Sequence, residues 1–185
     1  MSLFGDGLEA AVQKAFTRPA PKTAPAQMRY LVKQLKSTRA VAQMLRISQR
    51  TVERYVKNQI KKPRPDLAAR LEREVNRRWQ PQIRAKARQR AATTGGIVID
   101  TRARIGYTAP VGTTDDARIR HLTVALPPHY AARLFDAQQA GAGDQQLQQI
   151  AAEGLKEMYF QDGGRRAGSL EEVRFTDIEH IEFDL

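Results

Sequence analysis

The stretch Arg39-Ala-Val-Ala-Gln-Met-Leu-Arg-Ile-Ser-Gln-Arg-Thr-Val-Glu-Arg-Tyr55 has the residue spacing of a helix-turn-helix. Ala42 is small enough for the point where two helices cross, and Ile47 is the apolar residue of the turn. Ser48 can cap the second helix through its side-chain oxygen. Arg46 stands where the turn usually has a left-handed Gly, which costs about 1 kcal/mol. The pattern predicts a DNA-binding helix pair, with a helical hairpin that only packs as the alternative.

The outward side chains of the second helix are basic or polar. They fall on its first turns, which are the turns that meet base edges and phosphates in a major groove. Arginine guanidinium groups suit guanine edges and phosphates, and Gln49 can recognise adenine. Basic residues continue on both sides of this helix. The candidate DNA-binding residues are therefore Arg39, Gln49, Arg50, Thr51, Arg54, Lys57, Lys61, Lys62 and Arg64.

Positive charge is concentrated in the first half of the chain, which has 185 residues and a formal net charge of +11. Residues 27–90 contain 19 Lys and Arg against 4 Asp and Glu, whereas residues 121–185 contain 5 against 11. This asymmetry predicts nucleic-acid binding upstream and a different role downstream. Further arginines are expected mostly to neutralise phosphates, which gives salt-sensitive and sequence-independent affinity. They are Arg70, Arg73, Arg77, Arg78, Arg84, Arg88 and Arg90.

The sequence predicts an α+β protein in which an all-helical helix-turn-helix domain precedes a small α+β domain. Within residues 1–26, Leu8, Val12 and Phe16 recur every four positions, which is typical of a short helix that covers part of a core, and a Pro-rich linker follows. Residues 27–92 form the basic DNA-binding domain, and residues 93–185 form the α+β domain. Strands are expected near 97–99, 104–107, 121–126 and 173–185, and helices after Pro127 and from Asp144.

The chain lacks the residue patterns of several function classes. It has no cysteine, which excludes disulfides and thiolate zinc sites. Its three histidines show no ligand spacing, and no Walker-type phosphate loop occurs. These features predict a protein that is not an enzyme and has no cofactor of its own. The sequence contains neither a signal-peptide pattern nor a long apolar stretch, so a cytoplasmic location without membrane contact is expected.

A loop is predicted at Pro110-Val-Gly-Thr-Thr-Asp-Asp116 because Pro, Gly and Asp favour turns. Its adjacent carboxylates, Asp115 and Asp116, are a weak catalytic signal. As an alternative to a loop residue, Thr114 could equally well be the N-cap of a helix that starts at Asp115.

Farther along, His121-Leu-Thr-Val-Ala-Leu-Pro-Pro128 followed by two helices also resembles a ribbon-helix-helix module. This interpretation is less favoured because that half of the chain is acidic.

Several long stretches resemble the telomere terminal proteins of Streptomyces linear chromosomes and plasmids. They are Met1-Ser-Leu-Phe-Gly-Asp-Gly-Leu-Glu-Ala-Ala-Val-Gln-Lys-Ala-Phe16, the helix-turn-helix, Gly95-Gly-Ile-Val-Ile-Asp-Thr101, Ala109-Pro-Val-Gly-Thr-Thr-Asp115 and Gly168-Ser-Leu-Glu-Glu-Val-Arg-Phe175. The resemblance covers essentially the whole chain. It implies a protein that caps the 5′ ends of linear DNA and stays covalently attached to them. Such a protein primes the DNA synthesis that fills the gap opposite the 3′ overhang.

The resemblance also implies an attachment residue and a set of partners. The family's attachment threonine falls on Thr114, in the segment that also holds Thr113, Asp115 and Asp116. A partner DNA polymerase would supply Mg²⁺ and a dNTP, with dCTP as the expected first nucleotide. The other implied partners are telomeric DNA and a telomere-associated protein bound to the overhang. The implied location is the nucleoid, at DNA ends.

The residues by themselves leave two alternatives open. Several other hydroxyl groups lie near the same segments, and only the resemblance favours Thr114 over Thr113, Tyr107, Thr108 and Ser169. The alternative function is a non-covalent helix-turn-helix regulator or partition protein whose second half dimerises or binds an effector.

Overall fold

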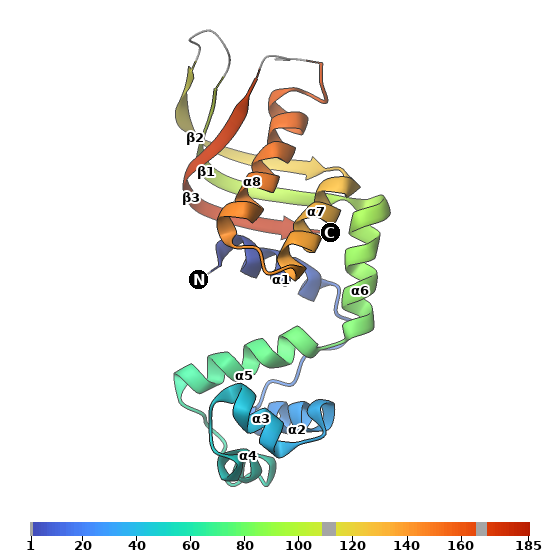
Figure 1. Ribbon diagram of the computed structural model, residues 1–185, viewed down its shortest axis with the longest axis vertical. Helices are drawn as coiled ribbons and strands as arrows, with labels where there is room; N and C mark the ends of the chain where they lie inside the picture. Colours follow the sequence, from blue (N-terminus) through green and yellow to red (C-terminus); the bar gives the residue numbers. More distant parts are fainter. Residues whose placement is uncertain (1, 109–113, 166–169) are drawn as a thin grey trace. The chain divides into compact units, whose positions relative to one another are not determined.

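The computed structural model describes residues 2–108, 114–165 and 170–185, with the side chains of residues 114–116 left aside. These residues form two compact units, one of residues 17–81 and the other of residues 1–16 and 82–185 (Figure 1). The predicted fold class is confirmed, because an N-terminal helical domain accompanies a small α+β domain with an antiparallel sheet.

The helical unit contains α2 (Ala24–Leu35), α3 (Thr38–Leu45), α4 (Gln49–Val56) and α5 (Pro65–Arg78). Apolar residues three or four positions apart give each helix one buried side. These sides form a single core that includes Met28, Leu31, Val41, Leu45, Val52, Tyr55, Leu67, Leu71 and Val75. The predicted cap of α4 by Ser48 is confirmed, and Ser37 caps α3 in the same way. Ser37 Oγ accepts from the backbone N–H of Ala40, and Ser48 Oγ accepts from that of Thr51.

The sheet of the α+β unit consists of β1 (Ile97–Thr108), β2 (Thr114–Leu126) and β3 (Glu172–Asp184). β1 is central, and both neighbours pair with it in antiparallel register. The two short strands expected near 97–99 and 104–107 are parts of β1, because Thr101 and Ala103 continue the buried alternation between them. The closing strand is confirmed as β3. β2 pairs with β1 of the same chain, which disfavours a ribbon-helix-helix module.

Helices cover one face of this sheet (Figure 1). They include α7 (Pro128–Gln139) and α8 (Asp144–Leu155), which is followed by a π-helical turn, η2 (Lys156–Phe160). α6 (Pro81–Arg90) leads to β1 through a similar turn, η1 (Ala91–Gly95). Gly154 allows α8 to lie close to β2, since a Cβ at this position would be 2.6 Å from Leu126 Cδ1. The core beneath the helices includes Ile97, Ile99, Leu126, Leu134, Phe135, Leu147 and Phe183.

Helix α1 (Leu3–Lys14) belongs to the α+β unit and packs beside β3. Phe4, Leu8 and Val12 are buried in its core, and the centre of the Phe4 ring lies 6.0 Å from that of Phe183. The prediction that this helix covers part of a core is confirmed. The predicted boundaries of 1–26, 27–92 and 93–185 differ from those of the structure. The reason is that α1 and α6 pack with the sheet, which leaves residues 17–81 as the helical unit.

Asp144, the first residue of α8, holds the N-terminus of α1. Its carboxylate accepts hydrogen bonds from the Ser2 hydroxyl (2.7 Å) and from the backbone N–H groups of Leu3 (2.5 Å), Phe4 (3.2 Å) and Gly5 (3.3 Å). Burial acts to raise the pKa of Asp144, but the hydrogen bonds outweigh it and hold this pKa below its usual value. The ionised carboxylate therefore stabilises the contact between α1 and α8.

The contact at Asp144 is expected to make stability depend on pH. A carboxyl whose pKa is lower in the folded state stabilises that state above its unfolded pKa, about 3.9, and the contribution is lost as the pH falls through the folded pKa. Asp144→Asn should therefore lower the free energy of unfolding by about 1 kcal/mol at neutral pH and by much less under acid conditions. Urea unfolding over a pH series measures this. Asp136→Asn, at an exposed carboxylate, is the matched control, and equal losses for Asp144→Asn at all pH values would contradict the assignment.

Candidate nucleic-acid interface and attachment segment

Helices α3 and α4 lie where the helix-turn-helix was predicted and are joined by a short turn. Arg46 follows α3 in the left-handed conformation, with φ 53° and ψ 50°. The N–H of Ile47 donates to the carbonyl of Ala42 over 2.9 Å, which is the closing hydrogen bond of a Schellman ending. Ala42 is only 4% exposed, as the crossing of two helices requires. Ser48 then caps α4, whose first two residues, Gln49 and Arg50, are exposed.

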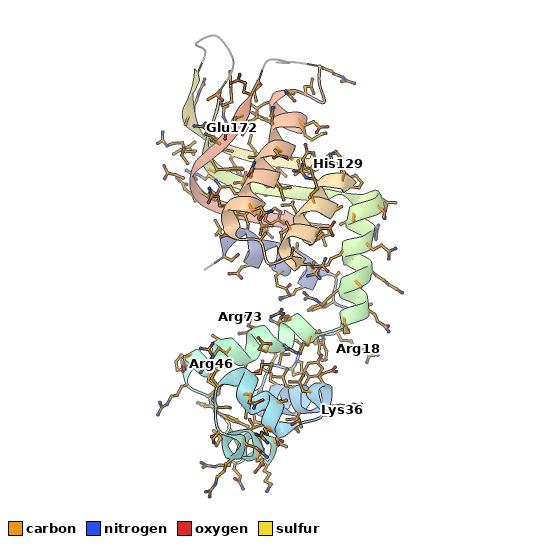
Figure 2. All side chains as sticks on the ribbon, in the orientation of Figure 1. Arg18, Lys36, Arg46, Arg73, His129 and Glu172 are labelled. Atoms are coloured by element: carbon orange, nitrogen blue, oxygen red, sulfur yellow. The ribbon has the colours of Figure 1, made fainter. Side chains whose placement is uncertain are left out.

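Arg46→Gly is expected to stabilise the protein. An L-residue in the left-handed region is strained by about 1–2 kcal/mol, and Gly removes this strain while adding flexibility to the unfolded chain. The expected net gain in the free energy of unfolding is about 0.5–1 kcal/mol, measured by urea denaturation. Arg46→Ala keeps the Cβ and removes the same charge, so it should give no gain. If the Gly variant is no more stable than the Ala variant, the inference that the backbone of Arg46 is strained is contradicted. Arg46 is labelled in Figure 2.

The exposed side of α4 presents two arginines without ion-pair partners. Arg50 and Arg54 are exposed, and neither forms an ion pair or a side-chain hydrogen bond with any residue that the structure describes. The opposite side of the helix is buried through Val52 and Tyr55. Both guanidinium groups are therefore available to a ligand that binds the exposed side of α4.

The two polar candidates on α4 are engaged within the helix. Gln49 Nε2 donates to Glu53 Oε1 over 3.0 Å. Thr51 is half-buried, and its hydroxyl lies 2.8 Å from Ser48 Oγ. Recognition of a base by Gln49 requires that its contact with Glu53 be exchanged for one with DNA.

Further basic candidates flank this helix. Arg39 lies in α3, Lys57 directly follows α4, and Lys61, Lys62 and Arg64 lie between α4 and α5. All of these side chains are exposed, and within the described part of the chain none pairs with a carboxylate. They are available for phosphate contacts, which carry affinity without sequence preference.

Two arginines expected to neutralise phosphates have a different role. Arg84 is only 6% exposed, and its Nη1 and Nη2 lie 2.5 and 2.6 Å from the two carboxylate oxygens of Glu9. The guanidinium of Arg88 lies 5.7 Å from the ring of Phe135, and burial holds the pKa of Arg88 below its usual value. Both therefore attach α6 to the α+β unit. The prediction for them was wrong because the sequence does not reveal Glu9 of α1 and Phe135 of α7 as their partners.

Thr114 is the first residue of β2. Its backbone pairs with that of Thr108, the last residue of β1, and Asp115 pairs with Tyr107. Thr114, Asp115 and Asp116 thus belong to a strand rather than to the predicted loop, and the alternative helix start at Asp115 is wrong. Thr113 lies outside the described residues, as do the other positions from 109 to 112. The candidate attachment residue therefore stands at the first position of a paired strand.

The neighbouring end of β1 is held by contacts with β3 and with the turn after α8. The N–H of Glu171 donates to the carbonyl of Thr108 over 2.8 Å. The ring of Tyr107 meets that of Phe160 edge-on at 5.5 Å, and the guanidinium of Arg120 lies 5.4 Å from the Phe160 ring. Among the other candidate hydroxyls, Tyr107 and Thr108 are half-buried, and Ser169 lies outside the described residues. These contacts fix the strand against which Thr114 is paired.

A side-chain cluster on the sheet was missed by the sequence analysis. Asp100 lies 2.5 Å from the Thr123 hydroxyl, 3.3 Å from His121 Nε2 and 3.6 Å from His180 Nε2. The hydrogen bond from Thr123 is the main cause that holds the pKa of Asp100 below its usual value. The three strands bring these residues together, so sequence spacing carried no signal. Among the described residues no group of His, Asp and Glu has the arrangement needed for a metal ion.

The helices in the described ranges are each too short or too polar to cross a membrane. Comparison of the chain with protein-family models, with curated proteins and with solved structures finds no match.

Proposed function

We propose that this protein binds the ends of linear DNA and primes DNA synthesis, becoming covalently attached to the 5′ end through Thr114. The observation that carries DNA binding is the pair of exposed arginines, Arg50 and Arg54, on the outward side of α4. The charge asymmetry of the chain supports the same assignment. The resemblance to telomere terminal proteins supports the priming role and the choice of Thr114.

In the proposed reaction the Thr114 hydroxyl takes the place of a primer 3′-hydroxyl. Its Oγ attacks the α-phosphorus of a dNTP, preferably dCTP. A bond between Oγ and phosphorus forms, the bond to the β-phosphate oxygen breaks, and pyrophosphate leaves. The hydroxyl proton passes to a base in the polymerase site. The 3′-hydroxyl of the attached nucleotide is then extended.

The chemistry of this step belongs to a partner DNA polymerase. A threonine hydroxyl is a weak nucleophile at neutral pH, and the Mg²⁺ ions of a polymerase lower the barrier for in-line attack on a phosphate. The chain is thus a substrate and not an enzyme. A telomere-associated protein bound to the 3′ overhang would recruit it, and the proposed location is the nucleoid at DNA ends.

A non-covalent helix-turn-helix regulator or partition protein is the alternative, because the α3–α4 geometry serves either role. The two proposals differ in the bond to DNA. Protein isolated from cells with its DNA should remain attached to DNA ends after detergent and heat. Alkali should then release the DNA, because a threonine phosphodiester can β-eliminate whereas a tyrosine phosphodiester cannot. DNA ends free of this polypeptide would leave only the non-covalent alternative.

A further inference from the structure

The two outer strands of the sheet differ in how their free edges are protected. At β3, α1 packs beside the strand, and Lys14 Nζ lies 2.7 Å from Glu182 Oε1. Closer to the start of β3, Gln148 of α8 donates to the carbonyl of Phe175 over 3.1 Å. The pairing of β3 with β1 also shifts its register at two places. Such irregularities, together with covering elements, make a strand edge unsuitable for pairing with a further strand.

The free edge of β2 is regular over residues 117–125, all of which the structure describes. Among the described strands β2 pairs with β1 alone. The register of this pair is unbroken from Ile97 and Leu126 to Ile105 and Arg118. Residues 117–125 contain neither Pro nor Lys, which commonly protect the edge of a sheet. A long regular edge of this kind is a template for another strand.

The pairing of Ile105 shows which backbone groups of β2 point outward. Ile105 lies opposite Phe175 on one side and Arg118 on the other. Because the carbonyl of Phe175 is turned to α8, the backbone hydrogen bonds of Ile105 go to Arg118. Every second residue of β2 then directs its N–H and C=O groups away from β1, where no described residue binds them. These residues are Ile119, His121, Thr123 and Ala125.

The side chains of these four residues are exposed. Leu122 and Leu126, which alternate with them, are buried beneath the helices, so the four lie on the opposite face of the sheet. Ile119 is 51% exposed, the highest value among the large apolar side chains that the structure describes. A strand added at this edge would cover part of Ile119 and bind the outward backbone groups at the same time.

The residues of this edge suit the same edge of a second copy. We consider an antiparallel pair with a two-fold axis at Leu122, which sets outward backbone groups opposite each other. The opposed residues are then Ile119 with Ala125, His121 with Thr123, and Arg120 with Val124. No two charges of one sign are opposed in this register. An axis at His121 would oppose that residue to itself, and an axis at Ile119 would oppose Arg118 to Arg120.

We propose that two copies of this protein pair through the free edges of β2, from Ile119 to Ala125, and form one continuous antiparallel sheet. The paired segment begins after Thr114, so the candidate attachment residue stays outside it. The dimer carries two α4 helices, and two linked recognition helices bind DNA more tightly than one. One strand from each copy is a small interface, so dimerisation in the micromolar range is expected. The inference requires neither DNA nor a covalent bond to it.

Sedimentation velocity of the full chain over a concentration series tests the dimer. Ile119→Lys replaces the exposed apolar side chain of the edge with a charge, so it should weaken dimerisation by about tenfold or more. The matched control is Leu185→Lys, at a side chain that is 41% exposed and follows the end of β3. It should change dimerisation by less than about twofold. Circular dichroism checks that both variants keep the fold.

Two results of this series would overturn the proposal. One is a chain that stays monomeric at every concentration, which would leave the β2 edge to a strand of a different protein. The other is a dimer that Ile119→Lys does not weaken, which would place the contact between copies elsewhere.

Disulfide cross-linking tests the register of the pair. The chain has no cysteine, so introduced thiols have no background. The Cα atoms of Ile119 and the opposed Ala125 of the partner should lie about 5.5 Å apart, a separation that a disulfide spans. Within one chain the same two positions are about 20 Å apart along the strand, so no internal disulfide can form.

The double variant Ile119→Cys with Ala125→Cys should therefore form covalent dimers in a glutathione redox buffer, as seen by non-reducing electrophoresis. Each single variant is a matched control, because in this register its thiol lies about 20 Å from that of the partner. Equal cross-linking in single and double variants, or none in the double variant, would overturn the pairing. The assay contains no DNA, so its outcome is distinguishable from a failure of the proposed priming function.

Discussion

Thr114→Ala is expected to reduce the transfer of radiolabelled dCMP to the chain to background level, with the fold intact. The variant lacks the only atom that can form the phosphoester in the proposed reaction. Thr114 begins β2 and pairs with Thr108 through the backbone, which alanine preserves. The substitution should therefore change the free energy of unfolding by less than about 0.5 kcal/mol. The measurement is incorporation of label with the partner polymerase, Mg²⁺ and each dNTP in turn.

The controls for this experiment are variants that change Thr114 to another hydroxyl residue or remove a neighbouring hydroxyl. Thr114→Ser retains a nucleophile and should retain part of the labelling. Thr108→Ala, across the β1–β2 pair, and Thr113→Ala should leave it unchanged. Labelling of Thr114→Ala at the level of the unaltered chain would show that another residue is the attachment site. Mapping of the labelled peptide would then identify that residue.

Most of the helical unit could be predicted because its determinants are local in sequence. Ser37 and Ser48 cap helices within three residues of their own positions. Ala42 and Ile47 are joined by the hydrogen bond that closes the turn. Such contacts join residues a few positions apart, so spacing alone reveals them.

The errors concern contacts between distant segments. The pairing of Arg84 with Glu9 joins residues 75 positions apart, and an alternating basic run gives no indication of it. Likewise, Thr114 was expected in a loop because Pro, Gly and Asp favour turns, while its strand pairing depends on β1. Local propensity was overridden by tertiary structure at both places.

The candidate sites show the same limit. Outward positions on α4 follow from helical periodicity, and Arg50 and Arg54 were predicted on that basis. The Asp100 cluster could not be predicted, since its residues come from three separate strands. Whether Gln49 and Thr51 are free to contact DNA is also set by side-chain partners, which a sequence pattern does not specify.

The double variant Arg50→Ala with Arg54→Ala is expected to weaken DNA binding by about a hundredfold and to reduce the salt dependence of binding. Each arginine that contacts a phosphate releases about one counterion, so the slope of log K against log salt should become shallower by about two units. The α4 fold should persist, because both side chains are exposed and its core contacts come from Val52 and Tyr55. Binding to end-sequence duplexes over a salt series, measured by fluorescence anisotropy, gives both quantities.

The matched control removes two arginines from α5. Arg73, labelled in Figure 2, and Arg77 are exposed, and neither pairs with an acid among the described residues. Arg73→Ala with Arg77→Ala thus produces the same change in net charge.

If α4 is the recognition helix, the control should weaken binding equally to all sequences, and only the α4 variant should lose preference for the end sequence. An unchanged salt slope in the α4 variant would show that Arg50 and Arg54 do not face phosphate. Equal loss in both variants would mean that affinity follows overall charge, which removes the main support for recognition through α4.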